Sequence, residues 1–204
     1  MIHGTPNGGI NGTLSNGLIA HWSFNNGSLE DSSGNGNTLG GYIQKSADKD
    51  FQAIDAAGTG SQLGLPAPIF ALTDYAPFAF SIWFEKNTYS SAMQILIGAG
   101  QQNGGGCYVK VQDGYVQIVA NYLVKAVAHQ NSLQAYNCLT ISYDGGSTLR
   151  YKLNNEAVVE NSVYITRLTE LDKYFNFAIG VASNGFSYPF QSSFDEIRVY
   201  NSLS

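Results

Sequence analysis

Short apolar segments with two-residue periodicity, each followed by a turn signal, are the feature that most constrains this chain. In residues 18–24 every second side chain is apolar, with Trp22 and Phe24 on the expected core face and His21 on the other. Such alternation is typical of a half-buried β-strand. Similar segments recur about every ten residues, which predicts an antiparallel sandwich rather than alternating strands and helices.

Other segments of this kind predict further strands, and no window has a convincing helical period. The expected strands are 78–84, 95–98, 107–112, 115–120, 139–143, 149–153, 175–181 and 194–200. A chain of 204 residues can form one sandwich domain. We therefore expect an all-β, two-sheet antiparallel domain over residues 17–204, preceded by a polar, Gly- and Asn-rich arm or linker at 1–16.

Two turns predict β-hairpins. Asp113-Gly114, between two alternating segments, is the strongest short hairpin signal in the chain, and Asp144-Gly145-Gly146 is the second. Each hairpin is expected to have one polar and one buried face, as a sandwich requires. On the polar faces we expect the side chains of Tyr108, Lys110, Gln112, Arg150 and Lys152.

Charge and hydropathy argue against several classes of partner. Charged residues make up only 12 % of the chain, the formal net charge is −5, and there is no basic run of the kind that nucleic-acid binding requires. No apolar run approaches the roughly 20 residues of a membrane helix, so membrane insertion is not expected. The N-terminus lacks the features of a signal peptide. We expect an extracellular, cell-surface or virion location.

The two cysteines, Cys107 and Cys138, both fall in predicted strands. One interpretation is a disulfide bridge between them. Two buried thiols that act as small hydrophobic side chains are the favoured interpretation, because secreted disulfide scaffolds carry more cysteines.

Several motifs, in order along the chain, resemble laminin-G-like jellyroll domains of the concanavalin A-like lectin superfamily. They are Gly17–Phe24, Asp31–Asn37, Phe80–Trp83, Leu139–Asp144 with Leu149–Asn154, Phe177–Gly180, and Phe194–Asn201. The resemblance implies a concanavalin A-like jellyroll and a lectin-like binding function. The sequence departs from the family pattern at Asn25, Cys138 and Asn154-Asn155.

A structural calcium ion is the cofactor that these motifs suggest. Residues 31–37 offer a carboxylate, two carboxamides and backbone carbonyls, and calcium takes six to eight oxygen ligands. The resemblance implies that Asp195 lies nearby. We therefore predict calcium held by Asp31, Asn35 and Asp195, with backbone oxygens around Asn37. The alternative is an ordinary Asx-turn loop that needs no ion, and Asn25 weakens the case for metal because it replaces a frequent Asp.

An enzymatic function is not expected. Retaining glycosidases need two carboxyl groups about 5–5.5 Å apart, and no sequence motif supplies such a pair. Glu170-Leu171-Asp172 lacks a third acid in register, and Asp195-Glu196 are adjacent and so expected on opposite faces of a strand. The three histidines have no metal-ligand spacing, and neither a Gly-x-Ser-x-Gly motif nor a phosphate loop is present.

The predicted function is that of a non-catalytic, lectin-like adhesion module that binds cell-surface or polymeric carbohydrate. Aromatic rings and polar side chains make such a site, and the candidate ligand-binding residues are Phe186, Tyr188, Tyr108, Arg150 and Lys152. The alternative is a structural, decoration or receptor-binding protein of a virion, such as a phage head or tail fibre, with a protein partner bound through the N-terminal arm. An unrecognised hydrolase is the third hypothesis.

Overall fold

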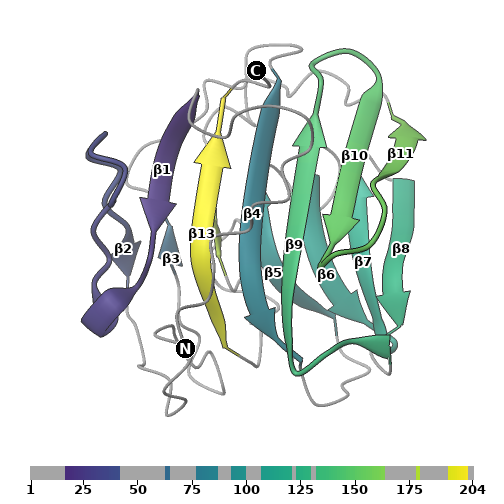
Figure 1. Cartoon of the computed structure of the whole chain (residues 1–204), viewed down its shortest axis with the longest axis horizontal. Helices are drawn as coiled ribbons and strands as arrows, with labels where there is room; N and C mark the ends of the chain where they lie inside the picture. Colours follow the sequence, from purple (N-terminus) through teal and green to yellow (C-terminus); the bar gives the residue numbers. More distant parts are fainter. Residues whose placement is uncertain are drawn as a thin grey trace.

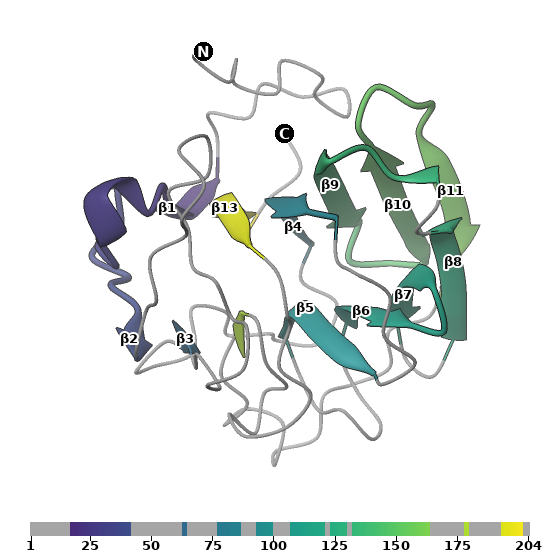
Figure 2. The ribbon, with the colours of Figure 1, turned by 90° about the horizontal axis from the view of Figure 1, so that it is seen from below.

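Two antiparallel sheets stack face to face in the computed structural model of the chain (Figures 1 and 2). The structure describes residues 17–41, 63–64, 77–86, 93–99, 107–120, 123–129, 132–163, 178–179 and 193–201. Within these residues helical conformation is limited to 3-10 turns, namely η1 (Asn25–Gly27) and the single residue Ser132. The predicted all-β antiparallel sandwich is therefore confirmed.

Among the described residues, one sheet has six strands and the other has seven. The six-stranded sheet has the order β1 (Leu18–Trp22), β13 (Phe194–Tyr200), β4 (Phe78–Glu85), β9 (Tyr136–Tyr143), β10 (Thr148–Leu153) and β11 (Val159–Ser162). The seven-stranded sheet has the order β2 (Gly40–Gly41), β3 (Leu63–Gly64), β12 (Ala178–Ile179), β5 (Gln94–Ala99), β6 (Cys107–Gln112), β7 (Tyr115–Ala120) and β8 (Leu123–His129).

The core lies between the sheets and contains the inward side chains of both. Trp22, Phe80 and Ile82 line it from the six-stranded sheet, and Val109 and Ile118 line it from the other. Each of them is at most 1 % exposed. The two-residue alternation seen in the sequence is thus the alternation between core and outer face.

The first strand is shorter than predicted, because the chain leaves the extended conformation at Phe24. Phe24 has a φ of 50°, and η1 begins at the next residue. Its side chain still reaches the core and lies edge-on to Phe194, with ring centroids 5.9 Å apart. The core assignment of Phe24 is therefore right, although its assignment to a strand is wrong.

Both predicted hairpins are present. Asp113 and Gly114 have φ values of 50° and 79°, and a type I′ turn requires positive φ at both central residues. In the second hairpin, Asp144 Oδ1 accepts the N–H groups of Gly146, Ser147 and Thr148 at 2.8–3.0 Å. This side chain closes the connection between β9 and β10.

Strand β13 contains a β-bulge that overturns one expectation. Its pairing with β4 shifts register between Asp195 and Arg198, and Glu196 has a φ of 50°. Asp195 pairs with the outward Trp83, while Glu196 contacts His21 and Arg198 on the same outer face. The two acids therefore do not point to opposite faces, because the extra residue of a bulge breaks the alternation.

Cys138 is a free thiol on β9 and is buried. Burial raises its pKa to about 11, although a hydrogen bond with Thr140 acts in the other direction. The side chain of Cys107 lies outside the described part of the structure, as do residues 1–16 and the loop with Phe186 and Tyr188. In the described ranges, no helix has the length and apolar character needed to cross a membrane.

Candidate functional site

Five side chains on the outer side of the seven-stranded sheet form the candidate site, here called the β6–β8 face: Tyr108, Lys110, Gln112, Tyr115 and Gln117. They point outward because their neighbours in β6 and β7 fill the core. The register places Lys110 opposite Gln117 and Gln112 opposite Tyr115. Directly opposite residues have Cβ atoms about 4.5–5.5 Å apart, so these side chains form one cluster.

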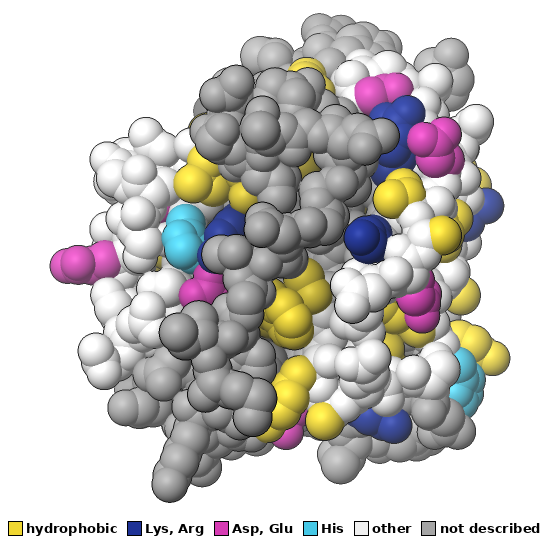
Figure 3. Space-filling view, viewed as in Figure 1, with side chains coloured by type: hydrophobic (Ala, Val, Ile, Leu, Met, Phe, Trp, Pro, Cys, Tyr) yellow, Lys and Arg dark blue, Asp and Glu magenta, His cyan; other side chains and the backbone are white. Residues whose placement is uncertain are grey.

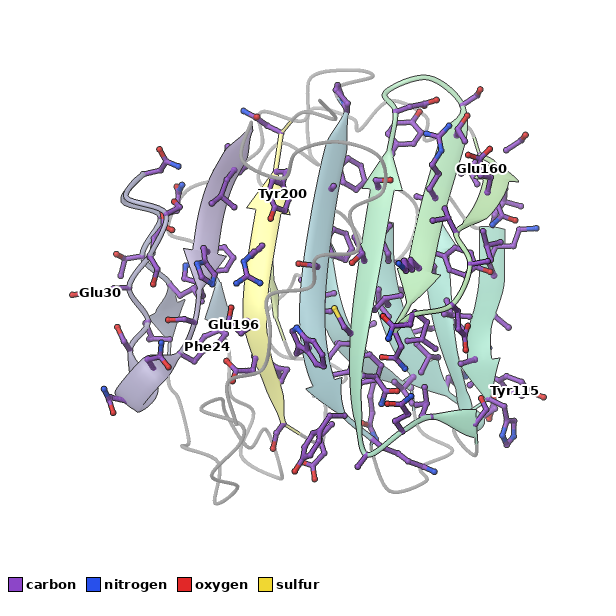
Figure 4. The ribbon with its side chains drawn as sticks, viewed as in Figure 1. Phe24, Glu30, Tyr115, Glu160, Glu196 and Tyr200 are labelled. Carbon is purple, nitrogen blue, oxygen red and sulfur yellow. The ribbon has the colours of Figure 1, made fainter. Side chains whose placement is uncertain are left out.

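Two contacts fix side chains on this face. Lys110 Nζ donates a hydrogen bond to Gln112 Oε1 at 2.7 Å. The ring of Tyr115 meets His129 of β8 edge-on, with ring centroids 4.8 Å apart and an interplanar angle of 88°. Tyr115 is nevertheless 40 % exposed, so its ring remains open to a ligand (Figure 4).

Lys110 gives the face a partly dehydrated cation. Burial lowers the pKa of the Lys110 ammonium, while the negative charge of Asp113 acts in the other direction. No described carboxylate lies within ion-pair distance of Lys110. The face therefore combines an ammonium, two carboxamides and phenol rings, which can bond hydroxyl or anionic groups and cover an apolar ring.

The predicted ligand residues do not share one surface. Tyr108 lies on the β6–β8 face, whereas Arg150 and Lys152 lie on β10, on the outer side of the six-stranded sheet. The two outer faces point away from each other (Figure 2). Arg150 Nε also donates a hydrogen bond to Glu160 Oε1 at 2.6 Å, so the guanidinium of Arg150 is in an ion pair.

The loop after β1 is organised by Asp31. Its Oδ1 accepts the N–H groups of His21 and Ser33 at 2.9 and 2.8 Å, and its Oδ2 accepts the N–H of Asn37 at 3.0 Å. Burial alone would raise the pKa of Asp31, but these hydrogen bonds outweigh it and lower the pKa below its usual value. The carboxylate thus closes the loop onto the end of β1.

The two asparagines of the loop reinforce the same closure. Asn35 Nδ2 donates to the carbonyls of Leu18 and Ile19 at 3.0 and 3.3 Å, and Asn37 Nδ2 donates to Ile19 at 2.6 Å. The Asn37 carbonyl accepts the indole N–H of Trp22 at 2.8 Å. The loop is therefore fixed to β1 by side-chain amides as well as by Asp31.

This arrangement bears on the predicted calcium ion. The Asp31 carboxylate and the Asn37 carbonyl already accept N–H donors, and Asp195 Oδ1 accepts the N–H of Glu196 at 2.8 Å. No group of three or more His, Cys, Asp or Glu side chains in the described ranges is arranged to hold a metal ion. The oxygens as placed do not fit calcium coordination through Asp31, and calcium binding stays a prediction.

An ion-pair cluster on the outer face of β1 and β13 was not predicted from the sequence. Glu196 Oε2 lies 2.8 Å from His21 Nε2 and 2.5 Å from Arg198 Nη2. Burial would raise the pKa of Glu196, but the hydrogen bond with His21 and the charge of Arg198 lower it overall. Glu196, which Figure 4 labels, lies left of centre in this view, where Figure 3 shows histidine, basic and acidic side chains together. The cluster joins the first and last described strands.

A protein-family model described as the concanavalin A-like lectin/glucanases superfamily matches residues 57–203. The chain belongs to this superfamily. Its membership confirms the resemblance seen in the sequence motifs. The superfamily includes both lectins and glucanases by its description, so membership alone does not distinguish binding from hydrolysis.

Solved structures share the fold of the superfamily at low sequence identity. Domain 4 of AbnA, a GH43 extracellular arabinanase from Geobacillus stearothermophilus, in complex with arabinotriose, is 20 % identical over 92 % of this chain and 94 % of its own, with a TM-score of 0.60. The binding domain of botulinum neurotoxin DC in complex with rat synaptotagmin II is 12 % identical over 94 % of this chain, with a TM-score of 0.61.

A third similar structure is of botulinum neurotoxin type C, which is dependent upon interaction with two ganglioside molecules to enter cells. It is 13 % identical over 92 % of this chain, with a TM-score of 0.63. The chain spans about half the length of the two toxin chains, covering 50 % and 48 % of them. No curated protein matches this sequence. At these identities the solved structures show the shared fold alone.

Proposed function

We propose that this domain is a non-catalytic carbohydrate-binding module with a role in adhesion, and that its β6–β8 face binds the sugar. The cross-strand cluster of Tyr115, Gln117, Lys110 and Gln112 is the observation that carries the proposal. An exposed ring covers the apolar face of a sugar, while amides and an ammonium bond its hydroxyl groups. Two paired strands already hold all of these groups in place, so little conformational entropy is lost on binding.

The similar structures support a binding role. The arabinanase domain is in complex with arabinotriose, and the type C neurotoxin interacts with gangliosides. A protein receptor is also represented, since the neurotoxin DC domain is in complex with synaptotagmin II. Carbohydrate is the favoured ligand class for this chain because of the side chains on its own β6–β8 face.

The two adjacent acids of β13 favour binding over hydrolysis. Asp195 and Glu196 share an outer face, but the carboxylate of Glu196 is paired with Arg198 and His21. Its pKa is lowered as a result, whereas the general acid of a glycosidase needs a raised pKa. Glu196 is therefore suited to an ion pair and not to protonating a leaving group.

A glycan array with the purified chain, run with calcium and again with a chelator, tests the proposal. We expect binding that survives chelation and that falls at least about tenfold, or about 1.4 kcal/mol, in Tyr115→Ala and Gln117→Ala. Lys152→Ala, on the opposite sheet, is the matched control and should bind like the parent. If glycan binding were lost in Lys152→Ala alone, the site would instead lie on the six-stranded sheet, where Arg150 also lies.

Absence of glycan binding under both conditions would contradict the proposal and favour a protein ligand. The virion role, the extracellular or cell-surface location and a partner bound through residues 1–16 stay predictions. The loop with Phe186 and Tyr188 also stays a predicted contact, outside the described residues.

A further inference from the structure

The exposed large hydrophobic side chains of the described residues gather at one side of the sandwich. They are Tyr115, Leu123, Val124, Val158 and Val159. They lie on β7, on β8, at the start of β11 or, for Val158, immediately before it, and β8 and β11 are the end strands of the two described sheets. Both ends lie side by side in the two views of the fold (Figures 1 and 2). Leu123 and Val124 are adjacent at the start of β8, and neighbouring exposed apolar side chains are a candidate interaction surface.

Strand β8 offers a partner a row of backbone groups. It pairs with β7 along one edge, and no described strand pairs with its other edge. An unpaired edge presents N–H and C=O groups that can extend the sheet into another chain. Leu123 and Val124, which are 47 % and 49 % exposed, begin this strand.

Natural edge strands usually carry charges and bulges that prevent such pairing. In β8 the register with β7 is interrupted at Val127, but Leu123–Ala126 pair with β7 without interruption. Within this segment the single charged side chain is Lys125. Leu123–Ala126, the most apolar part of β8, therefore has little protection against pairing with another chain.

A second copy of the chain fits this edge in a register centred on Val124. A two-fold axis perpendicular to the sheet places residues of the same face opposite each other. A register centred on Lys125 would put two ammonium groups together, which is unfavourable. A register centred on Val124 pairs Val124 with the partner's Val124, and Leu123 with the partner's Lys125, whose alkyl stem can cover the leucine.

We propose that the chain forms a symmetric dimer in which β8 pairs antiparallel with β8 of a second copy, centred on Val124. The two seven-stranded sheets then become one continuous sheet. The two β6–β8 faces lie on the same side of that sheet, next to each other. Two linked sites bind a repeating ligand with a higher avidity than either site alone. The dimer itself does not depend on the nature of the ligand.

Sedimentation of the full chain at micromolar concentration tests the dimer. We expect twice the mass of one chain. In Val124→Lys two ammonium groups would meet on the axis, so the dissociation constant should rise at least about tenfold. Thr38→Lys adds the same charge at an exposed position just before β2, which is at the other end of the seven-stranded sheet from β8, and should remain dimeric. Val124→Ile should also remain dimeric.

A cross-link tests the register and does not depend on how Val124→Lys folds. Directly opposite residues of an antiparallel pair have Cα atoms about 4.5–5.5 Å apart, within the range that a disulfide spans. Oxidised Val124→Cys should therefore yield a dimer in which mass spectrometry finds a 124–124 bond, and Thr38→Cys should not. A monomeric parent chain, or a Val124→Cys protein without this bond, would overturn the proposal.

Discussion

The carboxylate of Asp31 fixes the loop after β1 by accepting three backbone N–H groups, from His21, Ser33 and Asn37. Hydrogen bonds to a charged acceptor contribute more than neutral ones, about 1.5–3 kcal/mol each. At a half-buried site, water can form some of these hydrogen bonds when the protein does not, so the net contribution to stability is smaller. At the scale of a single residue, Asp31 is therefore the side chain on which the shape of this loop most depends.

We expect Asp31→Asn to lower the free energy of unfolding by about 1.5–3 kcal/mol, since one oxygen acceptor becomes a donor that faces N–H groups. Urea unfolding measures this loss. Asp113→Asn removes the same charge from an exposed turn where Asn is equally suited, and should change stability by less than about 0.5 kcal/mol.

The same titration with calcium and with a chelator separates the two interpretations of the loop. The hydrogen bonds of Asp31 imply an equal loss in both solutions. A loss that occurs with calcium and vanishes with the chelator would show that Asp31 serves a metal ion instead. Parent-chain stability that rises with calcium would support the same conclusion.

The hydrogen bond between His21 and Glu196 could not be predicted, because 175 residues separate them along the chain. Their proximity also depends on the bulge at Glu196, whose φ of 50° is uncommon for this residue type. Two-residue alternation assumes a regular strand and so places Asp195 and Glu196 on opposite faces. The sequence carries no signal for the extra residue, since a Gly or Asn, which would mark it, is missing there.

At the scale of one element, the turn between β9 and β10 contains two neighbouring glycines with different roles. Gly145 has a φ of 80°, which favours glycine, whereas Gly146 is not among the described residues with positive φ. A Cβ on Gly146 would lie 3.4 Å from Asp144 Oδ1, an ordinary contact. The two positions therefore form a matched pair for mutation.

We expect Gly145→Ala to lower stability by about 1–2 kcal/mol through backbone strain. Gly146→Ala should change it by less than about 0.5 kcal/mol, because its backbone suits any residue. Thermal unfolding of both variants measures the difference. Equal losses would mean that the hydrogen bonds to Asp144, and not the φ of Gly145, control this turn.

Strands with clear alternation and hairpins with Asp-Gly turns could be predicted from the sequence. Strands β8 and β11 were missed for physical reasons. In β8 apolar residues occupy both faces, because the strand ends its sheet and one face is not fully covered. In β11 the sequence Val-Glu-Asn-Ser has little strand propensity, and pairing with β10 determines its conformation.

The candidate site was predicted only in part, for a related reason. Alternation correctly indicated that Tyr108, Arg150 and Lys152 point away from the core. It cannot indicate which sheet a strand joins, since that depends on pairing between segments distant in the sequence. Tyr115 joined the site only once the register of β6 and β7 was known.

At the scale of the whole molecule, three described carboxylates have a lowered pKa: Asp31, Asp144 and Glu196. Burial opposes the shift in each case, and hydrogen bonds or positive neighbours outweigh it. A carboxyl group whose folded pKa lies below its unfolded value stabilises the fold fully above the unfolded pKa of about 4. This contribution is lost as pH falls through the folded pKa.

We therefore expect stability to fall as the pH drops below about 4, because these groups take up protons in the unfolded chain first. Urea midpoints across this range measure the slope. Asp31→Asn should have a shallower slope than the parent, and Asp113→Asn, whose charge lies on an exposed turn, should retain the parent slope. A parent chain that becomes more stable on acidification would contradict this assignment.

Strands β1 and β13 are antiparallel neighbours, and the N–H of Asn201 donates to the carbonyl of Gly17 at 2.9 Å. The two ends of the described fold thus lie at the same end of one strand pair. A tensile load applied through Gly17 and Asn201 would pull this pair apart one hydrogen bond at a time, as a zipper opens, and would not shear all of its bonds together. The cluster of His21, Glu196 and Arg198 lies further along the same strand pair and would bear the load after the first hydrogen bonds have opened.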